Sequence, residues 1–209
     1  MDKIKLPLGQ IQTNCYLIHN NSDVLIVDPG DEAEKIIEAI GQLQKQVIAV
    51  ILTHTHFDHI GAVDAICEHF NVPVYVSNIE KHWLTDTEKN GSEKFMQYGL
   101  SPVIAKTKPM IIEPGSKKIG SFAFNVRHTP GHSPGSLSFV FEDFAIVGDT
   151  LFREGIGRTD LYEGNTQQLL NSIQQELLTL NDTMTICPGH GPYTTVKYEK
   201  ENNPFINGY

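Results

Sequence analysis

The feature that most restricts the fold of this chain is a series of short apolar segments, bounded by turn-forming residues, that alternates with helical patterns. The apolar segments have the composition of β-strands and span residues 24–27, 47–52, 73–76, 122–126, 137–141, 144–147 and 185–187. Amphipathic spacing predicts helices within residues 36–43, 60–70 and 169–178. The strand segments form two groups, each accompanied by helices. We therefore predict an α/β (α+β) fold with four αββα layers: two mixed sheets face to face and helices outside.

Length and composition predict one globular domain over residues 1–209. The chain is 40% hydrophobic and 20% charged, which is ordinary for a protein with a substantial core. Residues 80–108 are polar and lack strand signals, so we expect a helix and a surface excursion there, of undefined role.

Charge and hydropathy restrict the partners. With 16 basic and 25 acidic residues, the net charge of −9 disfavours a nucleic-acid partner. The longest aliphatic run, 47–52, is far shorter than the roughly 20 residues of a membrane span, and the N-terminal residues lack the apolar core of a signal peptide. Three cysteines without CxxC spacing argue against a disulfide framework and against a thiolate zinc cluster. We expect a cytoplasmic monomer or homodimer with no membrane or nucleic-acid partner.

Metal-ligand residues cluster directly after the predicted strand 47–52, as His54, His56, Asp58 and His59. Neutral imidazole and carboxylate are the ligands that zinc and similar metals take. The alternative is a polar loop in which Asp58 caps the following helix. The clustering favours one or two bound metals.

Three further donors follow other predicted strands, and glycine or proline flanks each of them. These donors are His132, Asp149 and His190. Flanking glycines and prolines allow the tight turns that bring such side chains together. Seven donors suffice for two sites of three ligands and one shared carboxylate, with positions left open for water. Open positions are typical of catalytic rather than structural metal sites.

The order of these donors resembles that of the metallo-β-lactamase superfamily, over about residues 6–205. Residues 148–152, 155–161 and 188–195 are similar to short glyoxalase II-like (hydroxyacylglutathione hydrolase-like) metal hydrolases. Glyoxalase II proper carries a C-terminal helical domain that binds glutathione, and we expect none here. The resemblance implies the αββα fold and a small-molecule thioester as substrate.

The resemblance also assigns roles to individual residues. It implies two divalent metal ions, zinc in the first place and iron or manganese as alternatives. His54, His56 and His132 would hold one ion, Asp58, His59 and His190 the other, and Asp149 would bridge them. A metal-bridging hydroxide would attack the thioester, with Asp58 as the catalytic residue that orients it. Arg158 would bind the substrate, unless it forms an ion pair with Asp160.

The function that these residues imply is hydrolysis of S-hydroxyacyl thioesters of a small thiol. One alternative is a mononuclear iron persulfide (sulfur) dioxygenase that uses His54, His132 and Asp149; others are hydrolysis of another ester or a lactone, and a non-catalytic metal-binding domain. Ser133 lies in a G-x-S-x-G pattern. However, Pro134 has no N–H for an oxyanion hole and a strand pattern follows, so we set a serine hydrolase aside.

Overall fold

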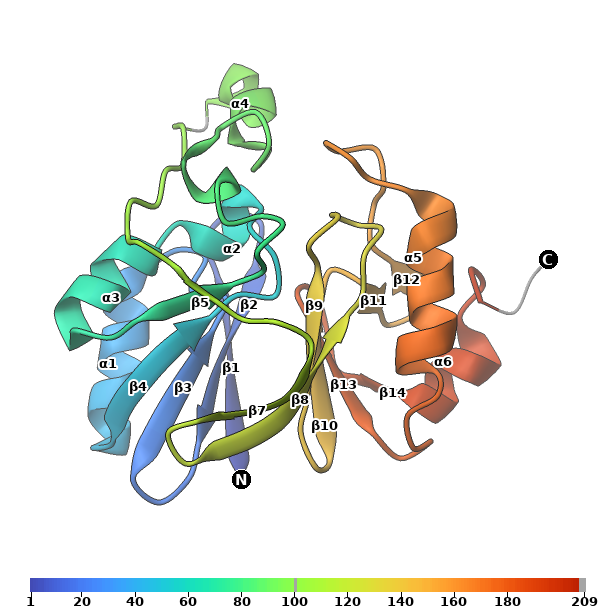
Figure 1. The fold of residues 1–209 in the computed structure, drawn as a ribbon, viewed down its shortest axis with the longest axis horizontal. Helices are drawn as coiled ribbons and strands as arrows, with labels where there is room; N and C mark the ends of the chain where they lie inside the picture. The colour runs from blue at the N-terminus through green and yellow to red at the C-terminus, as the bar shows by residue number, and fades with distance from the viewer. Residues whose placement is uncertain (100, 207–209) are drawn as a thin grey trace. The chain divides into compact units, whose positions relative to one another are not determined.

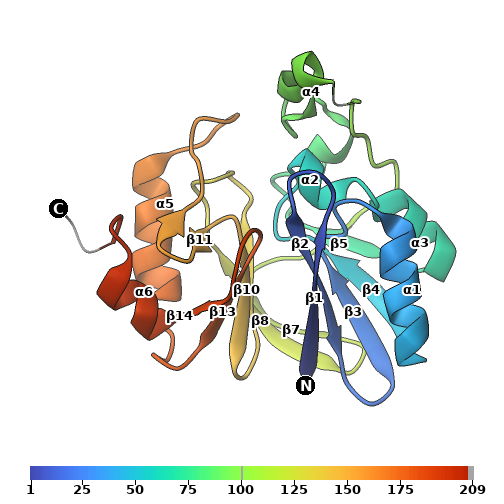
Figure 2. The same ribbon diagram turned by 180° about the vertical axis from the view of Figure 1, so that it is seen from behind.

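The computed structural model describes residues 1–99 and 101–206, which fall into two units (Figures 1 and 2). The first unit comprises Met1–Ile112 and Lys118–Phe122, and the second comprises Glu113–Lys117 and Ala123–Tyr209. Residue 100, which falls in the predicted segment 80–108, and residues 207–209, at the end of the predicted domain 1–209, lie outside the described residues. A single domain over residues 1–209 stays a prediction.

The first unit is built on a mixed sheet, in which the described residues form six strands in the order β1-β2-β3-β4-β5-β6. Three strands, β1 (Asp2–Leu8), β2 (Thr13–His19) and β3 (Asp23–Val27), pair antiparallel. The next three, β4 (Gln46–Ile51), β5 (Val74–Val76) and β6 (Met110–Ile111), continue parallel to β3. The carboxyl ends of β3, β4 and β5 therefore meet at one edge, where loops can bring polar side chains together.

Helices cover one face of this sheet (Figure 1). Ile36 and Ile40 of α1 (Ala33–Leu43) and Ile66 of α3 (Val63–Phe70) belong to the same buried cluster as Val24 and Ile26 of β3. The predicted helix 60–70 is divided, because a separate short helix, α2 (Phe57–Ile60), precedes α3. Segment 80–108 contains, in its described residues, the short helices η1 (Trp83–Thr85), α4 (Ser92–Phe95) and η2 (Met96–Tyr98).

The second unit is also built on a mixed sheet, with the order β14-β13-β10-β9-β8-β7 over its described strands. The strands are β7 (Gly115–Ile119), β8 (Phe122–His128), β9 (Leu137–Val140), β10 (Phe144–Gly148), β13 (Thr185–Pro188) and β14 (Thr194–Thr195). β9 is antiparallel to both β8 and β10, and β13 is parallel to β10. The carboxyl ends of β8, β10 and β13 therefore lie at one edge.

The helices of the second unit pack on the β10–β13 part of its sheet. Leu169 of α5 (Thr166–Ser172), Ile173 and Leu177 of the π-helical turn η3 (Ile173–Leu177), and Val196 of α6 (Val196–Asn202) share a buried cluster with β10 and β13. A two-stranded ribbon, β11 (Leu151–Phe152) with β12 (Gly155–Ile156), follows β10.

All the predicted strand segments are strands, with ends that differ by one or two residues. The β1–β2 hairpin was not predicted, although Ile4, Leu6 and Leu8 alternate with Lys3, Lys5 and Pro7 in β1. The alternative role of Asp58 as a helix cap is wrong: α2 begins at Phe57 and its N-cap is His56, so Asp58 lies in the first turn. Among the described residues, no helix is both long and apolar enough to cross a bilayer.

Candidate metal centre

The seven predicted donors divide into two clusters, one in each unit, and each cluster lies at the carboxyl edge of its sheet. All seven belong to sets of His and Asp residues suited to hold a metal ion. The first cluster holds His54, His56, Asp58 and His59 on the loop after β4 and in α2. The second holds His132, Asp149 and His190 on the loops after β8, β10 and β13.

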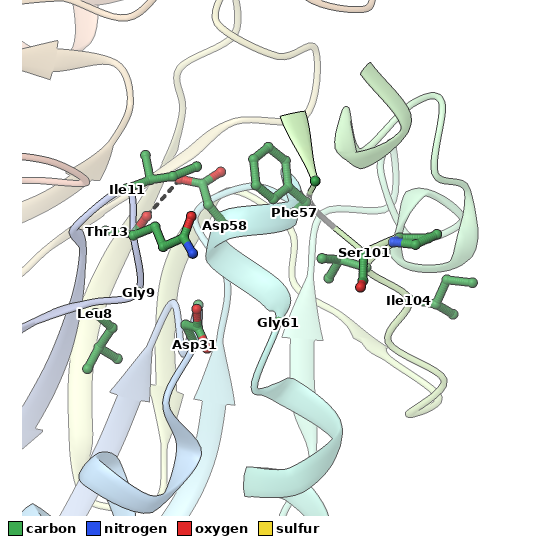
Figure 3. A pocket seen from close by; sticks show the side chains of 15 residues that line it. Leu8, Gly9, Ile11, Thr13, Asp31, Phe57, Asp58, Gly61, Ser101 and Ile104 are labelled. Atoms are coloured by element: carbon green, nitrogen blue, oxygen red, sulfur yellow. Dashed lines mark hydrogen bonds between the residues drawn. The ribbon is translucent and has the colours of Figure 1, made fainter. Parts of the chain in front are cut away.

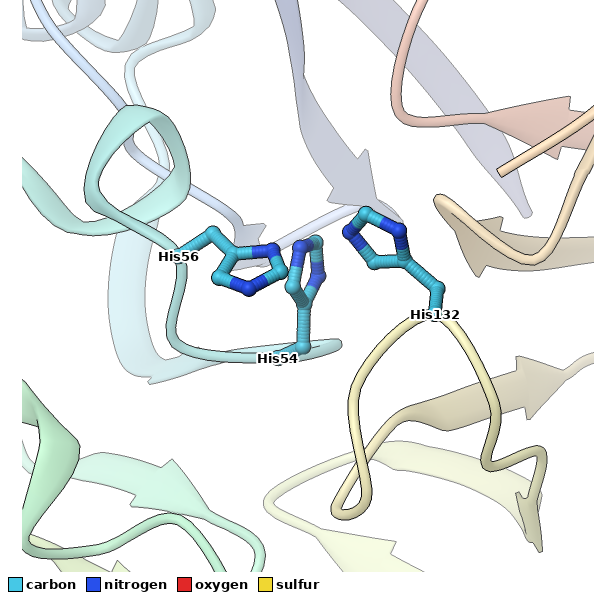
Figure 4. A group of neighbouring side chains, drawn as sticks. All are labelled: His54, His56 and His132. Atoms are coloured by element: carbon cyan, nitrogen blue, oxygen red, sulfur yellow. The ribbon is translucent and has the colours of Figure 1, made fainter. Parts of the chain in front are cut away.

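The first cluster is compact and largely buried. The His54 ring lies with its centroid 4.8 Å from that of His56 and 4.1 Å from that of His59, and both His54 and His56 extend from the same loop (Figure 4). His59 Nε2 lies 3.5 Å from Asp58 Oδ2. The three histidines are at most 3% exposed. Four donors that converge from one loop and one helical turn can contribute ligands to a common metal centre.

Asp28, which directly follows β3, holds this loop in place. Its Oδ1 accepts the Thr53 N–H (2.8 Å), and its Oδ2 accepts the Thr53 hydroxyl (2.6 Å) and lies 2.9 Å from His59 Nδ1. The carboxylate and the His59 ring are almost fully buried. With Nδ1–H donated to Asp28, the Nε2 lone pair of His59 is directed to a metal ligand position.

Glu80 also holds the loop that carries the histidines, by binding Thr55. This fully buried carboxylate follows β5 and accepts hydrogen bonds from the Thr55 N–H (2.9 Å) and hydroxyl (3.1 Å). No signal in the sequence pointed to Asp28 or Glu80, because each reaches the loop only through the parallel pairing of its strand with β4, which appears in the structure alone.

Close backbone packing fixes Asp58. A Cβ at Gly30 would lie 1.7 Å from the carbonyl oxygen of Asp58, so only glycine fits there. The Asp58 side chain accepts a hydrogen bond from Thr13 Oγ1 at Oδ2 (2.7 Å), which fixes the orientation of the carboxylate (Figure 3).

The second cluster is organised around Asp149. Its Oδ2 lies 3.6 Å from His132 Nε2 and 3.5 Å from His190 Nε2. His132, at the tip of the β8–β9 loop (Figure 4), lies with Nδ1 2.7 Å from the carbonyl oxygen of Arg158. This carbonyl fixes the tautomer with the proton on Nδ1 and directs the Nε2 lone pair toward a metal.

Glycine is required beside this cluster as well. A Cβ at Gly157 would lie 1.8 Å from the carbonyl oxygen of Asp149 and 3.1 Å from His132 Nδ1. The glycine thus allows the β11–β12 ribbon and its continuation to pass against both donors.

Arg158, the predicted substrate-binding residue, forms an ion pair. Its Nε and Nη2 donate to the two carboxylate oxygens of Asp160 at 2.7 and 2.8 Å, and this side-chain hydrogen bond raises the pKa of the guanidinium. The ion pair with Asp160 named as the alternative is therefore present. The role of Arg158 in substrate binding stays a prediction.

Comparison with known proteins identifies the family. The profile of the Metallo-beta-lactamase superfamily matches residues 8–190. A probable metallo-hydrolase, YqgX of Bacillus subtilis (strain 168), is 45% identical over 98% of this chain and 97% of its own. The hydroxyacylglutathione hydrolase GloC of Haemophilus influenzae is 37% identical over 97% of this chain and 96% of its own.

Solved structures agree with these relatives. The crystal structure of the BLEG-1 B3 metallo-β-lactamase has a TM-score of 0.94 and 42% identity over 99% of this chain and 100% of that one. TTHA1623, solved in a di-iron-bound form, has a TM-score of 0.86 and 33% identity over 97% and 99% of the two chains. The predicted fold of two mixed sheets with helices is confirmed, and so is the resemblance on which it rested. The chain belongs to the metallo-β-lactamase superfamily.

Proposed function

We propose that this protein is a binuclear metal-dependent hydrolase that cleaves thioesters formed between a hydroxy acid and a small thiol. The observation that supports it most is the pair of donor clusters, which together contain seven imidazole and carboxylate ligands. The similarity to the Haemophilus influenzae hydroxyacylglutathione hydrolase supports the thioester. The reaction consumes one water and releases the hydroxy acid and the free thiol.

The chemistry of the two clusters fits divalent metal ions. His59 and His132 each direct Nδ1 to a fixed oxygen acceptor, and such a hydrogen bond is typical of metal-ligating histidines. We assign His54, His56 and His132 to one ion, Asp58, His59 and His190 to the other, and Asp149 to both. When bound, the two ions lower the pKa of a water molecule and polarise a carbonyl oxygen.

Asp58 is the catalytic residue in this proposal. Its carboxylate would accept a hydrogen bond from the attacking water and orient it toward the thioester carbon. The hydrogen bond from Thr13 stops the carboxylate from rotating. Fixing the nucleophile and its acceptor in advance is a large part of enzymatic rate enhancement.

We propose zinc as the resident metal, with iron or manganese as alternatives. The di-iron-bound form of the similar protein TTHA1623 supports iron as an alternative. Metal analysis of protein purified without added metal, followed by reconstitution with each ion, distinguishes them. We expect about two ions per chain.

The decisive test is hydrolysis of S-D-lactoylglutathione by zinc-reconstituted protein beside a chelated sample. We expect turnover that chelation and Asp58→Ala both abolish. His69→Ala changes an exposed histidine outside both clusters and serves as the matched control, with turnover and metal content unchanged. Turnover that survives chelation would refute the proposal. Oxygen consumption by iron-loaded protein with a persulfide would instead support the dioxygenase alternative.

A second candidate is hydrolysis of β-lactams, which the 42% identity to the BLEG-1 B3 metallo-β-lactamase favours. The scissile bond is then an amide in a strained ring, and the same donors would serve. A chromogenic cephalosporin assayed with the same zinc-loaded protein compares the two substrates directly.

A further inference from the structure

A pocket of about 420 Å³ lies in the first unit, next to Asp58 (Figure 3). Its walls come from the turn between β1 and β2, from the loop after β3 with the start of α2, and from residues 99 and 101–104. The volume is within the range of small-molecule sites. A substrate whose scissile bond lies at Asp58 could extend into this pocket.

Asp58 is assigned to a metal ion in the proposed function, so among the described side chains of the pocket Asp31 supplies the remaining charge, which is negative. Among the pocket's described lining residues the charged side chains are Asp31 and Asp58, and no lysine or arginine is among them. Lys35, the cation on the first turns of α1, pairs with Glu32 at 2.5 Å. A carboxylate-bearing ligand would find no positive partner on these walls.

Asp31 is held in place although it is exposed. Its Oδ1 accepts the Glu32 N–H at 2.7 Å, and a Cβ at Gly9 would lie 2.5 Å from its Oδ2. The carboxylate thus lies against the backbone of the β1–β2 turn. Gly9 in turn donates its N–H to Glu32 Oε2 at 2.9 Å.

The remaining walls are partly apolar. Phe57 lines the pocket and packs on Phe95, with ring centroids 5.1 Å apart. Ile11 and Ile104 also line it and are 42% and 45% exposed. Such walls suit methylene or methyl groups that surround a charged centre.

We propose that this pocket binds the thiol-carrier half of the substrate, and that Asp31 makes it prefer a positively charged carrier over one that bears a carboxylate. The inference rests on the proposed thioesterase function and specifies its substrate class. Asp31 acts as a specificity-determining residue, because an exposed charge discriminates by attraction and repulsion at short range.

The test uses three S-D-lactoyl thioesters of similar size that differ in carrier charge. Thiocholine is positive, N-acetylcysteamine is neutral and 3-mercaptopropionate is negative. At low ionic strength we expect kcat/KM for the thiocholine ester to exceed that for the mercaptopropionate ester about five-fold or more. Asp31→Asn should bring the ratio close to one, and Asp31→Lys should reverse it. High salt should reduce the wild-type ratio.

Two controls isolate the pocket. Glu38→Gln removes one negative charge from an exposed position on α1 outside the pocket and should leave the ratio unchanged. Comparison of S-lactoyl and S-succinyl N-acetylcysteamine varies the acyl charge instead. If the Asp31 variants alter this acyl ratio and not the carrier ratio, the pocket holds the other half of the substrate and the proposal is wrong.

A binding measurement separates this inference from the proposed function. S-Methylthiocholine and 3-(methylthio)propionate cannot be hydrolysed, and their binding is followed by the amide chemical shifts of residues 9–13, 101, 103 and 104. If the cation binds in an Asp31-dependent way but no thioester is hydrolysed, the charge preference of the pocket is supported and the thioesterase function is rejected. If thioesters are hydrolysed without any preference for carrier charge, the inference about the pocket is rejected and the thioesterase function is supported. Neither binding nor hydrolysis would reject both.

Discussion

His59 Nδ1 and Asp28 Oδ2 lie 2.9 Å apart, and both side chains are shielded from solvent. Asp28 also occupies the left-handed region, with φ of 52°, a conformation that asparagine tolerates better than most residues. Asp28→Asn therefore keeps the side-chain shape and the backbone conformation, and it tests the hydrogen bond between Asp28 and His59 specifically.

We expect Asp28→Asn to weaken metal binding by roughly 10- to 100-fold. With its amide N–H toward His59 Nδ1, the asparagine favours the tautomer that carries its proton on Nε2, which cannot ligate a metal. Chelator competition measures the affinity, and thermal unfolding of metal-free protein checks that the fold persists. Unchanged affinity would show that Asp28 does not set the tautomer.

Gly157→Ala should abolish most activity and lower stability by about 2 kcal/mol. The new Cβ would overlap the Asp149 carbonyl oxygen and press on His132. Gly155→Ala is the matched control, because its Cβ would meet other atoms at no less than 3.6 Å. Urea denaturation and turnover measure the two effects. Equal behaviour of the two variants would contradict the steric argument.

Thr13→Val should reduce kcat about ten-fold or more and leave metal content unchanged. The substitution keeps the shape of a buried side chain but removes the hydroxyl that donates to Asp58, and hydrogen bonds to charged groups are worth roughly 1.5–3 kcal/mol. Thr13→Ser restores the donor and should recover much of the rate. Steady-state kinetics beside metal analysis test this, and a rate loss shared equally by the serine variant would count against it.

Asp64→Asn should destabilise the protein by roughly 1 kcal/mol at neutral pH, and the difference should vanish in acid. Burial acts to raise the pKa of Asp64, but hydrogen bonds from the Lys106 N–H and from the N–H and hydroxyl of Thr107 outweigh it and leave the pKa below its ordinary value. A lowered folded-state pKa contributes stability above about pH 4, and this contribution is lost as the pH falls through the folded-state value. Urea denaturation at pH 7 and near pH 2 measures it. A difference that grows in acid would contradict the assignment.

Periodicity and residue type predicted much of the fold. Strand β10 is buried along its whole length, and β4 is apolar from Val47 onward and largely buried, so both strands stand out in the sequence. All seven donors follow strands as predicted. The β1–β2 hairpin was missed because its first strand is only half-buried and carries Lys3, Lys5 and Pro7.

The supporting residues of the centre were harder to find. Asp28 and Glu80 hold the histidine loop only because β3, β4 and β5 are adjacent and parallel, and a pattern along the chain does not give strand order. Likewise, the carbonyl group of Arg158 that fixes His132 is a backbone group and has no signature in the sequence. Such partners emerge from topology rather than from residue type.

The division of the donors between the units also sets an order in time. Translation proceeds from the N-terminus, and N-terminal units tend to fold first. His54, His56, Asp58 and His59 are therefore synthesised well before His132, Asp149 and His190. A chain that ended before residue 132 would carry the first four candidate ligands and lack the other three.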